Sequence, residues 1–189
     1  MSSAPILTMC TSNRHKAEEV ARILGRPVEP VTISFAEVQE LDPARVSRPK
    51  AEQAARALGR PVIVDDTALM LESLGGFPGA LVAWALDAGG PAILFRMLPD
   101  RADARALAVT SIGYCDGERL EVFTGEVAGS VVAEPRGAHG FGFDPVFVPA
   151  GETRTLAEMA PHEKDLISPR RLALEKLRQF LDLDGAPSP

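Results

Sequence analysis

The chain has 189 residues, of which 46% are hydrophobic and 24% are charged, and its formal net charge at pH 7 is −6. A chain of this size can bury a core of its own, and its composition excludes a disordered protein. The excess of acidic residues argues against a broad basic surface for polymeric nucleic acid. No apolar run is long enough to span a membrane and no secretory leader is recognisable, so we expect a cytoplasmic protein.

Lysine is rare in this chain. Of the 20 basic residues only Lys16, Lys50, Lys164 and Lys176 are lysines, and the rest are arginines. A lysine ammonium is a compact point charge and an arginine guanidinium is a planar fork, so each lysine is a candidate for a specific role. The two cysteines, at positions 10 and 115, lie in apolar runs without metal-ligand spacing, and we expect buried reduced thiols.

The first third of the chain alternates between strand and helix patterns. Residues 5–9 form a short apolar run, and a helix pattern with apolar residues at 17, 20, 21 and 24 follows it. A second strand is predicted over 28–33 and a second helix over 46–58. Residues 62–64 then predict a short buried strand that ends at Asp65 and Asp66.

The rest of the chain has more strand patterns. After a glycine-rich turn at 74–79, the sequence predicts a helix over 91–98 and two strands over 106–114 and 120–132, joined by an Asp116-Gly117 hairpin turn. A strand is predicted at 145–148, a capping box at Thr155 and Glu158, and a last helix opened by Ser168 and Pro169. Early βα units followed by hairpins predict an α/β fold with a mixed sheet. We expect one domain over 1–189, with loose ends at 1–4 and 185–189.

A first candidate site lies at a strand-to-helix junction, in the run Thr11-Ser12-Asn13-Arg14-His15-Lys16. Free N–H groups at a helix start favour an anion, and Lys16 adds charge one turn later. Thr11 and Asn13 have the polar atoms to bond phosphate oxygens. Simple capping by Ser12 or Asn13, with a solvated lysine, is an equally ordinary explanation.

A second candidate site is the pair Asp65-Asp66, followed by Thr67. Open α/β sheets bind ligands at the carboxyl ends of their strands, and two adjacent carboxylates repel unless a cation or a proton is shared. Mg²⁺ is the natural partner, because it prefers carboxylate and phosphate oxygens. Glu37, in a loop after a predicted strand, is a third carboxylate. A polar turn is the alternative for the pair.

Two further segments carry binding chemistry. In Gly140-Phe141-Gly142-Phe143-Asp144-Pro145 a ring can stack on a base and Asp144 can accept from ring N–H groups, although a turn with two core phenylalanines fits as well. Lys164 and the helix start at Ser168-Pro169-Arg170 suit an oxygen-rich ligand, with capping and exposed charge as the alternative.

Taken in this order, six motifs resemble the inosine triphosphate pyrophosphatase (Ham1-like) family over most of the chain. The motifs are Thr-x-Asn-x-x-Lys at 11–16, the Glu-x-Gln loop at 37–39, Val-Asp-Asp-Thr at 64–67, Leu-Gly-Gly-x-Pro-Gly at 74–79, Gly-Phe-Gly-Phe-Asp-Pro at 140–145, and Glu-Lys-x-x-Ile-Ser-x-Arg at 163–170. The resemblance implies a two-lobed α/β fold with an elongated mixed sheet and a deep central cleft, and a homodimer.

The resemblance also implies an activity, which is Mg²⁺-dependent hydrolysis of nucleoside triphosphates to monophosphate and diphosphate, with ITP, dITP and XTP as substrates. It assigns metal binding to Glu37 and Asp66, and catalysis to Asp66 with Lys16, Lys50 and a supporting Asp65. The residues implied to hold the triphosphate are Thr11, Ser12, Asn13, Lys16, Lys50 and Thr67. The residues implied to hold the base are Phe141, Gly142, Phe143, Asp144, Lys164, Ser168 and Arg170.

The chain departs from the family pattern on the base side. Pro169 stands where the family usually has a histidine that helps to recognise the 6-oxo group, and proline offers neither a side-chain donor nor a backbone N–H. Leu81 stands where a tyrosine is usual, and Asp165 where an asparagine is usual. Two alternatives therefore accompany the main interpretation: an enzyme with relaxed or redirected base specificity, and a non-catalytic nucleotide-binding protein.

Overall fold

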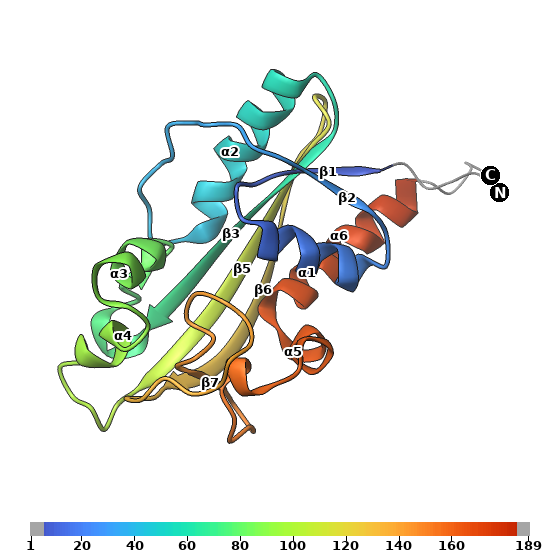
Figure 1. The fold of residues 1–189 in the computed structure, drawn as a ribbon. Coiled ribbons are helices and arrows are strands. Elements are labelled where there is room, and N and C mark those ends of the chain that lie inside the picture. The colour runs from blue at the N-terminus through green and yellow to red at the C-terminus, as the bar shows by residue number, and fades with distance from the viewer. Residues whose placement is uncertain (1–5, 185–189) are drawn as a thin grey trace.

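The computed structural model describes residues 6–184, and the predicted loose ends lie outside the described residues. Its centre is a seven-stranded mixed sheet in the order β2-β1-β3-β5-β6-β7, with β4 paired to β3 (Figure 1). The first three strands of this order are parallel and the later pairs are antiparallel. The strands are β1 (Leu7–Cys10), β2 (Val28–Val31), β3 (Val62–Leu71), β4 (Pro78–Gly79), β5 (Arg105–Cys115), β6 (Leu120–Val131) and β7 (Phe147–Pro149). The predicted α/β fold with a mixed sheet is confirmed.

Helices cover both faces of the sheet. On one face α2 packs its alanines against β3 and β5, and on the other α1 and α6 pack against Ile63 and Ile112 (Figure 1). The helices are α1 (Arg14–Leu24), α2 (Pro43–Leu58), α3 (Val82–Gly89), α4 (Ile93–Arg96), α5 (Pro161–Ile167) and α6 (Pro169–Asp184). None of these helices, within the described part of the chain, is both long and apolar enough to cross a bilayer.

One prediction about β3 was wrong in a way that matters for the site. The strand does not end at residue 64 but continues to Leu71, so Asp65 and Asp66 lie inside it. The reason is β5, whose residues pair with β3 from Val62 to Leu71, whereas the four-residue β1 pairs only with Val62 and Ile63. Asp65 and Asp66 therefore lie just beyond the end of the pairing between β1 and β3, where β3 is still paired with β5.

Local signals identified most of the other elements. The expected helix over 91–98 is helical only over Ile93–Arg96, and the helices α3 and α5 and the two-residue strand β4 were not expected. Helix α3 is apolar along most of its length and has no capping side chain, so it lacks the usual signals. Cys10 and Cys115 are buried free thiols, as predicted.

A polar band crosses the sheet on the face covered by α1 and α6. Along β3, Leu69 and Leu71 join one apolar cluster and Ile63 another, and Asp65 and Thr67 lie between them. On β5 the same alternation places Thr110 between the two clusters, directly opposite Thr67. The polar band therefore separates the two apolar clusters and places polar side chains together in the middle of the sheet.

Candidate functional site

The start of α1 places Lys16 over the sheet. Asn13 caps the helix, because its side-chain oxygen accepts from the backbone N–H groups of His15 at 3.0 Å and Lys16 at 3.3 Å. Thr11 in turn accepts from the Asn13 N–H at 3.0 Å. The structure therefore confirms the helix cap by Asn13 that the sequence offered as one of two explanations. The Lys16 side chain points toward β3, and its ammonium lies 2.7 Å from one carboxylate oxygen of Asp65.

Asp65 is the most strongly held carboxylate of the site. It is 4% exposed, and Arg170 from α6 donates to both of its oxygens, at 2.6 and 3.2 Å. Burial alone would raise the pKa of Asp65, but the Arg170 and Lys16 cations outweigh burial and hold that pKa well below its ordinary value. Asp65 is therefore held in its ionised form, as a fixed anion between two cations.

Asp66 faces the other side of the sheet, because successive side chains of a strand alternate. Lys50 on α2 donates to its Oδ1 at 2.9 Å and lies 2.6 Å from Glu37 in the loop before the helix. The other oxygen, Oδ2, is buried and has no hydrogen-bond partner among the described residues. Burial raises the pKa of Asp66, and the Lys50 and Lys16 cations offset this only in part.

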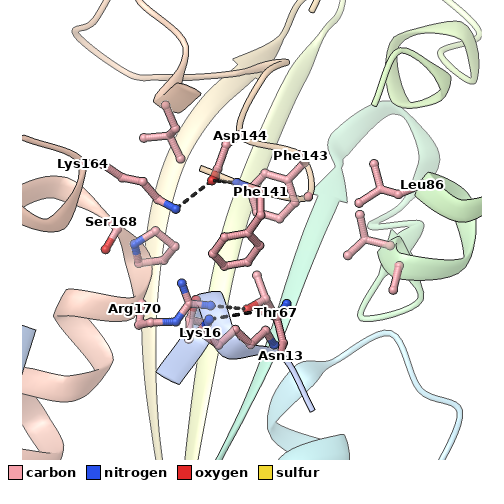
Figure 2. A pocket seen from close by; sticks show the side chains of 16 residues that line it. Asn13, Lys16, Thr67, Leu86, Phe141, Phe143, Asp144, Lys164, Ser168 and Arg170 are labelled. Atoms are coloured by element: carbon pink, nitrogen blue, oxygen red, sulfur yellow. Dashed lines mark hydrogen bonds and ion pairs between the residues drawn. The ribbon is translucent and has the colours of Figure 1, made fainter. Parts of the chain in front are cut away.

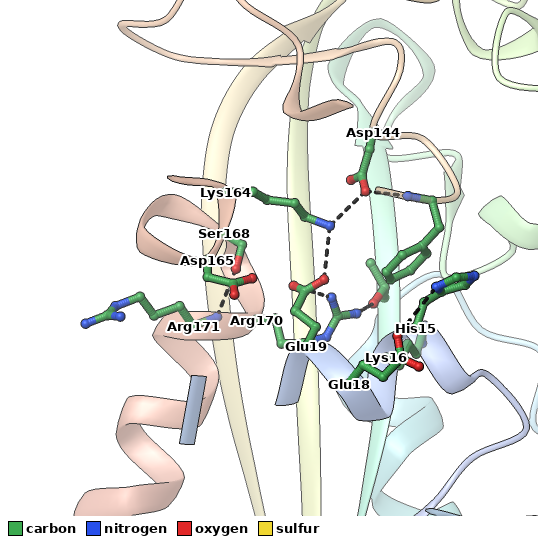
Figure 3. A network of polar contacts seen from close by, with 12 residues as sticks. His15, Lys16, Glu18, Glu19, Asp144, Lys164, Asp165, Ser168, Arg170 and Arg171 are labelled. Atoms are coloured by element: carbon green, nitrogen blue, oxygen red, sulfur yellow. Dashed lines mark hydrogen bonds and ion pairs between the residues drawn. The ribbon is translucent and has the colours of Figure 1, made fainter. Parts of the chain in front are cut away.

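A chain of buried ion pairs joins α1, α5 and α6 (Figure 3). Glu19, 2% exposed on α1, accepts from Lys164 at 3.1 Å and from Arg170 at 2.7 Å. Lys164 also donates to Asp144 at 2.7 Å, and Asp144 accepts from the backbone N–H of Phe141 at 2.7 Å. Burial raises the pKa of Glu19, yet the two cations outweigh it and that pKa is lowered. The cations of the site are therefore fixed by carboxylates rather than solvated.

A pocket with a volume of about 160 Å³ opens beside this network (Figure 2). The Phe141 ring lies within it, with the Lys164 ammonium 4.7 Å and the Arg170 guanidinium 5.5 Å from the ring centre. Val82 and Leu86 of α3 line the pocket as well. Such a pocket, aromatic and apolar with a few charged groups, suits a planar ring attached to an anionic tail.

Most of the predicted site residues converge on two adjoining places. The pocket is lined by ten of them, namely Asn13, Lys16, Thr67, Phe141, Gly142, Phe143, Asp144, Lys164, Ser168 and Arg170. Glu37 and Asp66 line a second hollow on the α2 side, next to Trp84, and Lys50 bridges the two carboxylates. Thr11 and Ser12 line neither space. Lys176, by contrast with the other lysines, donates to the Thr124 carbonyl at the surface.

The sequence left two interpretations of the phenylalanine motif open, a ring that stacks on a base and a ring in the core. Phe143 fits the core interpretation and Phe141 fits the stacking interpretation. Phe143 is 7% exposed and belongs to the apolar cluster under α3, so it is a core residue that also forms a pocket wall. Phe141 belongs to no core cluster among the described residues and stacks on His15, with ring centres 5.9 Å apart. Lys164 and Arg170 are buried, which rules out exposed charge as the explanation for that segment.

Sequence reasoning missed Glu19 and Thr110, and it noted Asp165 without its partner. Glu19 is a carboxylate beside Ala17 and Val20 on the buried face of α1, and a charge on an apolar stripe was the available signal. Asp165 accepts two hydrogen bonds from Arg22, at 2.8 and 3.2 Å, which ties α5 to α1. Thr110 lines the pocket from β5 and carried no sequence signal, because threonine is ordinary in a strand.

With this geometry in place, comparison with known proteins is decisive. The sequence profile of the Ham1 family matches residues 7–180. The chain belongs to the Ham1 family. A dITP/XTP pyrophosphatase of Hyperthermus butylicus is 40% identical over 97% of this chain and 98% of its own length. One of Pyrobaculum aerophilum, with the same description, is 38% identical over 93% of this chain and 95% of its own.

Solved structures of Ham1 proteins have the same fold. The Staphylococcus aureus Ham1 protein superposes with a TM-score of 0.81 at 28% identity, and covers 95% of this chain and 100% of its own. A Ham1 protein from Coxiella burnetii gives a TM-score of 0.80 at 26% identity, over 95% of this chain and 99% of its own. The Ham1 motifs recognised in the sequence therefore lie on the Ham1 fold.

Proposed function

We propose that this Ham1-family protein hydrolyses nucleoside triphosphates of non-standard purines, such as ITP, dITP and XTP, to the monophosphate and diphosphate. The observation that carries the proposal is the division of β3 at Asp65 and Asp66. One face holds a cationic and aromatic pocket, and the other holds a carboxylate pair with a lysine. The names of the relatives from Hyperthermus and Pyrobaculum supply the substrate class.

The phosphate side uses the cations nearest β3. Lys16 and Lys50 stand on opposite faces of the strand, and both neutralise charge that develops on phosphoryl oxygens as water attacks the α-phosphorus and the bond to the diphosphate breaks. We assign Thr11, Ser12, Asn13 and Thr67 to the same triphosphate. Thr11 and Ser12 serve through the helix start that they precede, since neither side chain lines the pocket.

Glu37 and Asp66 fit a divalent cation, which we take to be Mg²⁺. Mg²⁺ is usually held by one or two carboxylates together with substrate phosphates, and Asp66 Oδ2 is a buried oxygen without a partner. Among the described residues no group of three or more His, Cys, Asp or Glu side chains is placed to hold a metal by itself, which agrees with a site completed by substrate. When bound, the cation supplies charge stabilisation at the phosphates. Asp66 orients the attacking water and accepts its proton.

The base side uses the pocket. Phe141 stacks on the base, Phe143 and Leu86 form walls, and Lys164 and Arg170 contact its polar edge. Asp144 and Ser168 act on these groups: Asp144 fixes Lys164 and the Phe141 backbone, and Ser168 accepts from the Arg171 N–H at 3.2 Å and so starts α6. Gly142, with φ +64°, makes the turn between the two rings.

Redirected base specificity is the second candidate function, and Pro169 favours it. Pro169 is part of the pocket wall and offers no donor where the family pattern has a histidine. Leu81, the other departure expected on the base side, does not line this pocket but the hollow of Glu37 and Asp66, so it does not bear on the base. An enzyme of this kind keeps triphosphate hydrolysis and accepts ATP, GTP or an unusual purine nucleotide.

Diphosphate release from a panel of ITP, XTP, dATP, ATP and GTP tests both candidates. A preference of a hundredfold or more for ITP over ATP and GTP supports the first and rejects the second. Comparable rates on all five support the second. No diphosphate release from any of them, at saturating Mg²⁺, supports a non-catalytic nucleotide-binding protein instead.

We further propose a single-domain, cytoplasmic homodimer. The exposed apolar side chains of Phe77 and Trp84, 43% and 71% exposed, support a protein contact beside α3. Light scattering during gel filtration tests the dimer. A monomer at micromolar concentration would contradict it.

A further inference from the structure

Thr110 lines the pocket from the sheet. It lies in the middle of β5, is fully buried and stands opposite Thr67 on β3. Its hydroxyl oxygen has no hydrogen-bond partner among the described residues, although the side chain lines the pocket. A buried hydroxyl without a partner costs stability, and most buried polar groups of native proteins are paired.

The neighbours of Thr110 make this hydroxyl more unusual. Ala108 and Ile112, the next residues on the same face of β5, are buried and apolar. A valine at position 110 has the same shape and an equal preference for strands, and leaves no polar atom unpaired. Packing and strand formation therefore do not account for a threonine here.

The other polar groups of the pocket already have partners. Thr67 accepts from Arg170 at 3.1 Å and donates to Asp65 at 3.3 Å. The Ser168 hydroxyl accepts from the Arg171 N–H. Lys164 and Arg170 are each bound to carboxylates. Among the described side chains that line the pocket, Thr110 thus keeps a buried hydroxyl free both to donate and to accept.

The walls of the pocket set the orientation of a planar ligand. Figure 2 shows the rings of Phe141 and Phe143 on one side and Leu86 on the other, with the sheet behind them. A flat ring held between such walls presents its edge to the sheet and its faces to the apolar groups. Thr110 is on that sheet.

We propose that Thr110 is a specificity-determining residue whose hydroxyl hydrogen-bonds the polar edge of the bound base. The proposal rests on the proposed function, and it places base recognition on the sheet as well as on α5 and α6. The hydroxyl donates to a ring oxygen or nitrogen, or accepts from a ring N–H, by rotating about one bond. It therefore supplies a polar contact from the sheet in a pocket where Pro169 of α6 offers no donor.

Thr110→Val tests the proposal, with Thr110→Ser as the matched variant that keeps the hydroxyl. We compare kcat/KM for ITP with kcat/KM for ribose 5-triphosphate, which has the phosphates and sugar but no base. Thr110→Val is expected to lose about tenfold or more on ITP and less than about twofold on the base-free substrate. Thr110→Ser is expected to keep most of the ITP activity.

Thermal unfolding separates recognition from a structural role. Because Thr110→Val removes an unpaired buried hydroxyl, its Tm should equal or exceed that of the wild type. A lower Tm with an equal loss on both substrates overturns the proposal, and so does an unchanged kcat/KM for ITP.

The test also distinguishes this proposal from the proposed function. Wild-type protein that releases no diphosphate from any nucleotide contradicts the function alone. The role of Thr110 is then measured by calorimetric binding of inosine 5′-monophosphate and ribose 5-phosphate. Weaker binding of the former only, in Thr110→Val, supports the role; equal binding by wild type and variant rejects it.

Discussion

Asp65 and Asp66 are adjacent in the chain and point to opposite faces of β3, and each carboxylate is paired with its own lysine. Lys16 lies 2.7 Å from Asp65 on the α1 side, and Lys50 lies 2.9 Å from Asp66 on the α2 side. The repulsion expected between neighbouring carboxylates is thus relieved by two separate cations rather than by one shared ion. One strand thereby presents a structural anion on one face and, on the other, the carboxylate that we propose to be catalytic.

This division predicts opposite effects for two similar substitutions. Asp65→Asn leaves the buried Arg170 and the partly buried Lys16 beside a neutral amide, and we expect a loss of about 3–5 kcal/mol in the free energy of unfolding. Asp66→Asn leaves Lys50 paired with Glu37, so stability should change little, while diphosphate release falls about 100-fold or more.

Urea unfolding and steady-state rates on ITP measure the two effects side by side. Equal stability losses in the two variants would show that the faces are not independent. An Asp66→Asn protein with wild-type rates would remove Asp66 from the catalytic role and favour a nucleotide-binding protein.

Glu19 is expected to position the base-side cations rather than to touch substrate. Glu19→Gln deprives Lys164 and Arg170 of a shared carboxylate and leaves them with Asp144 and Asp65 respectively. We expect a loss of about 3 kcal/mol in stability and a rise of about tenfold in KM for ITP, with a smaller change in kcat.

Glu18→Gln is the control, because it makes the same chemical change one residue away on an exposed side chain. Its stability should stay within about 0.5 kcal/mol of wild type. A Glu19→Gln protein that behaves like Glu18→Gln would show that the buried network does not hold Lys164 and Arg170 in place.

Sequence reasoning succeeded where the determining contacts are local. The cap by Asn13, the turn at Asp116-Gly117 and the helix start at Ser168 depend on residues within three positions of one another. It failed where the partner is distant. Glu19 meets Lys164 across 145 positions, and no local pattern records that contact. Asp65 lies inside β3 because β5 is long enough to pair with all of that strand, and β5 comes about 40 residues later in the chain.

The hairpin between β5 and β6 gives a pH-dependent prediction away from the site. Burial alone would raise the pKa of Asp116, but the backbone N–H groups of Glu118 and Arg119, the Arg119 side chain and the Tyr114 hydroxyl outweigh it and lower that pKa to about 2. A carboxylate whose folded pKa is depressed stabilises the protein above its unfolded pKa, and this contribution disappears as pH falls through the folded value.

Asp116→Asn should therefore unfold a few degrees below wild type at pH 7, with the gap closing between about pH 4 and pH 2. Thermal unfolding at a series of pH values, with activity on ITP at pH 7 as the control for the distant site, measures this. A gap that is constant with pH would mean that the Asp116 charge contributes nothing and that only its hydrogen-bonding shape matters.

Pro169 offers a gain-of-specificity experiment. It is buried at the first position of α6, where proline is well tolerated because that N–H has no helical partner, and it lines the pocket between Ser168 and Arg170. Pro169→His restores the donor of the family pattern at a place where the backbone already suits a helix start. We expect the ratio of kcat/KM for ITP to that for ATP to rise about tenfold, through recognition of the 6-oxo group.

Pro169→Ala, which restores the N–H but no side-chain donor, should leave the ratio near wild type. If the two variants change the ratio equally, the missing histidine is not what sets base preference, and discrimination lies with the remaining pocket residues, Lys164 and Arg170 first among them.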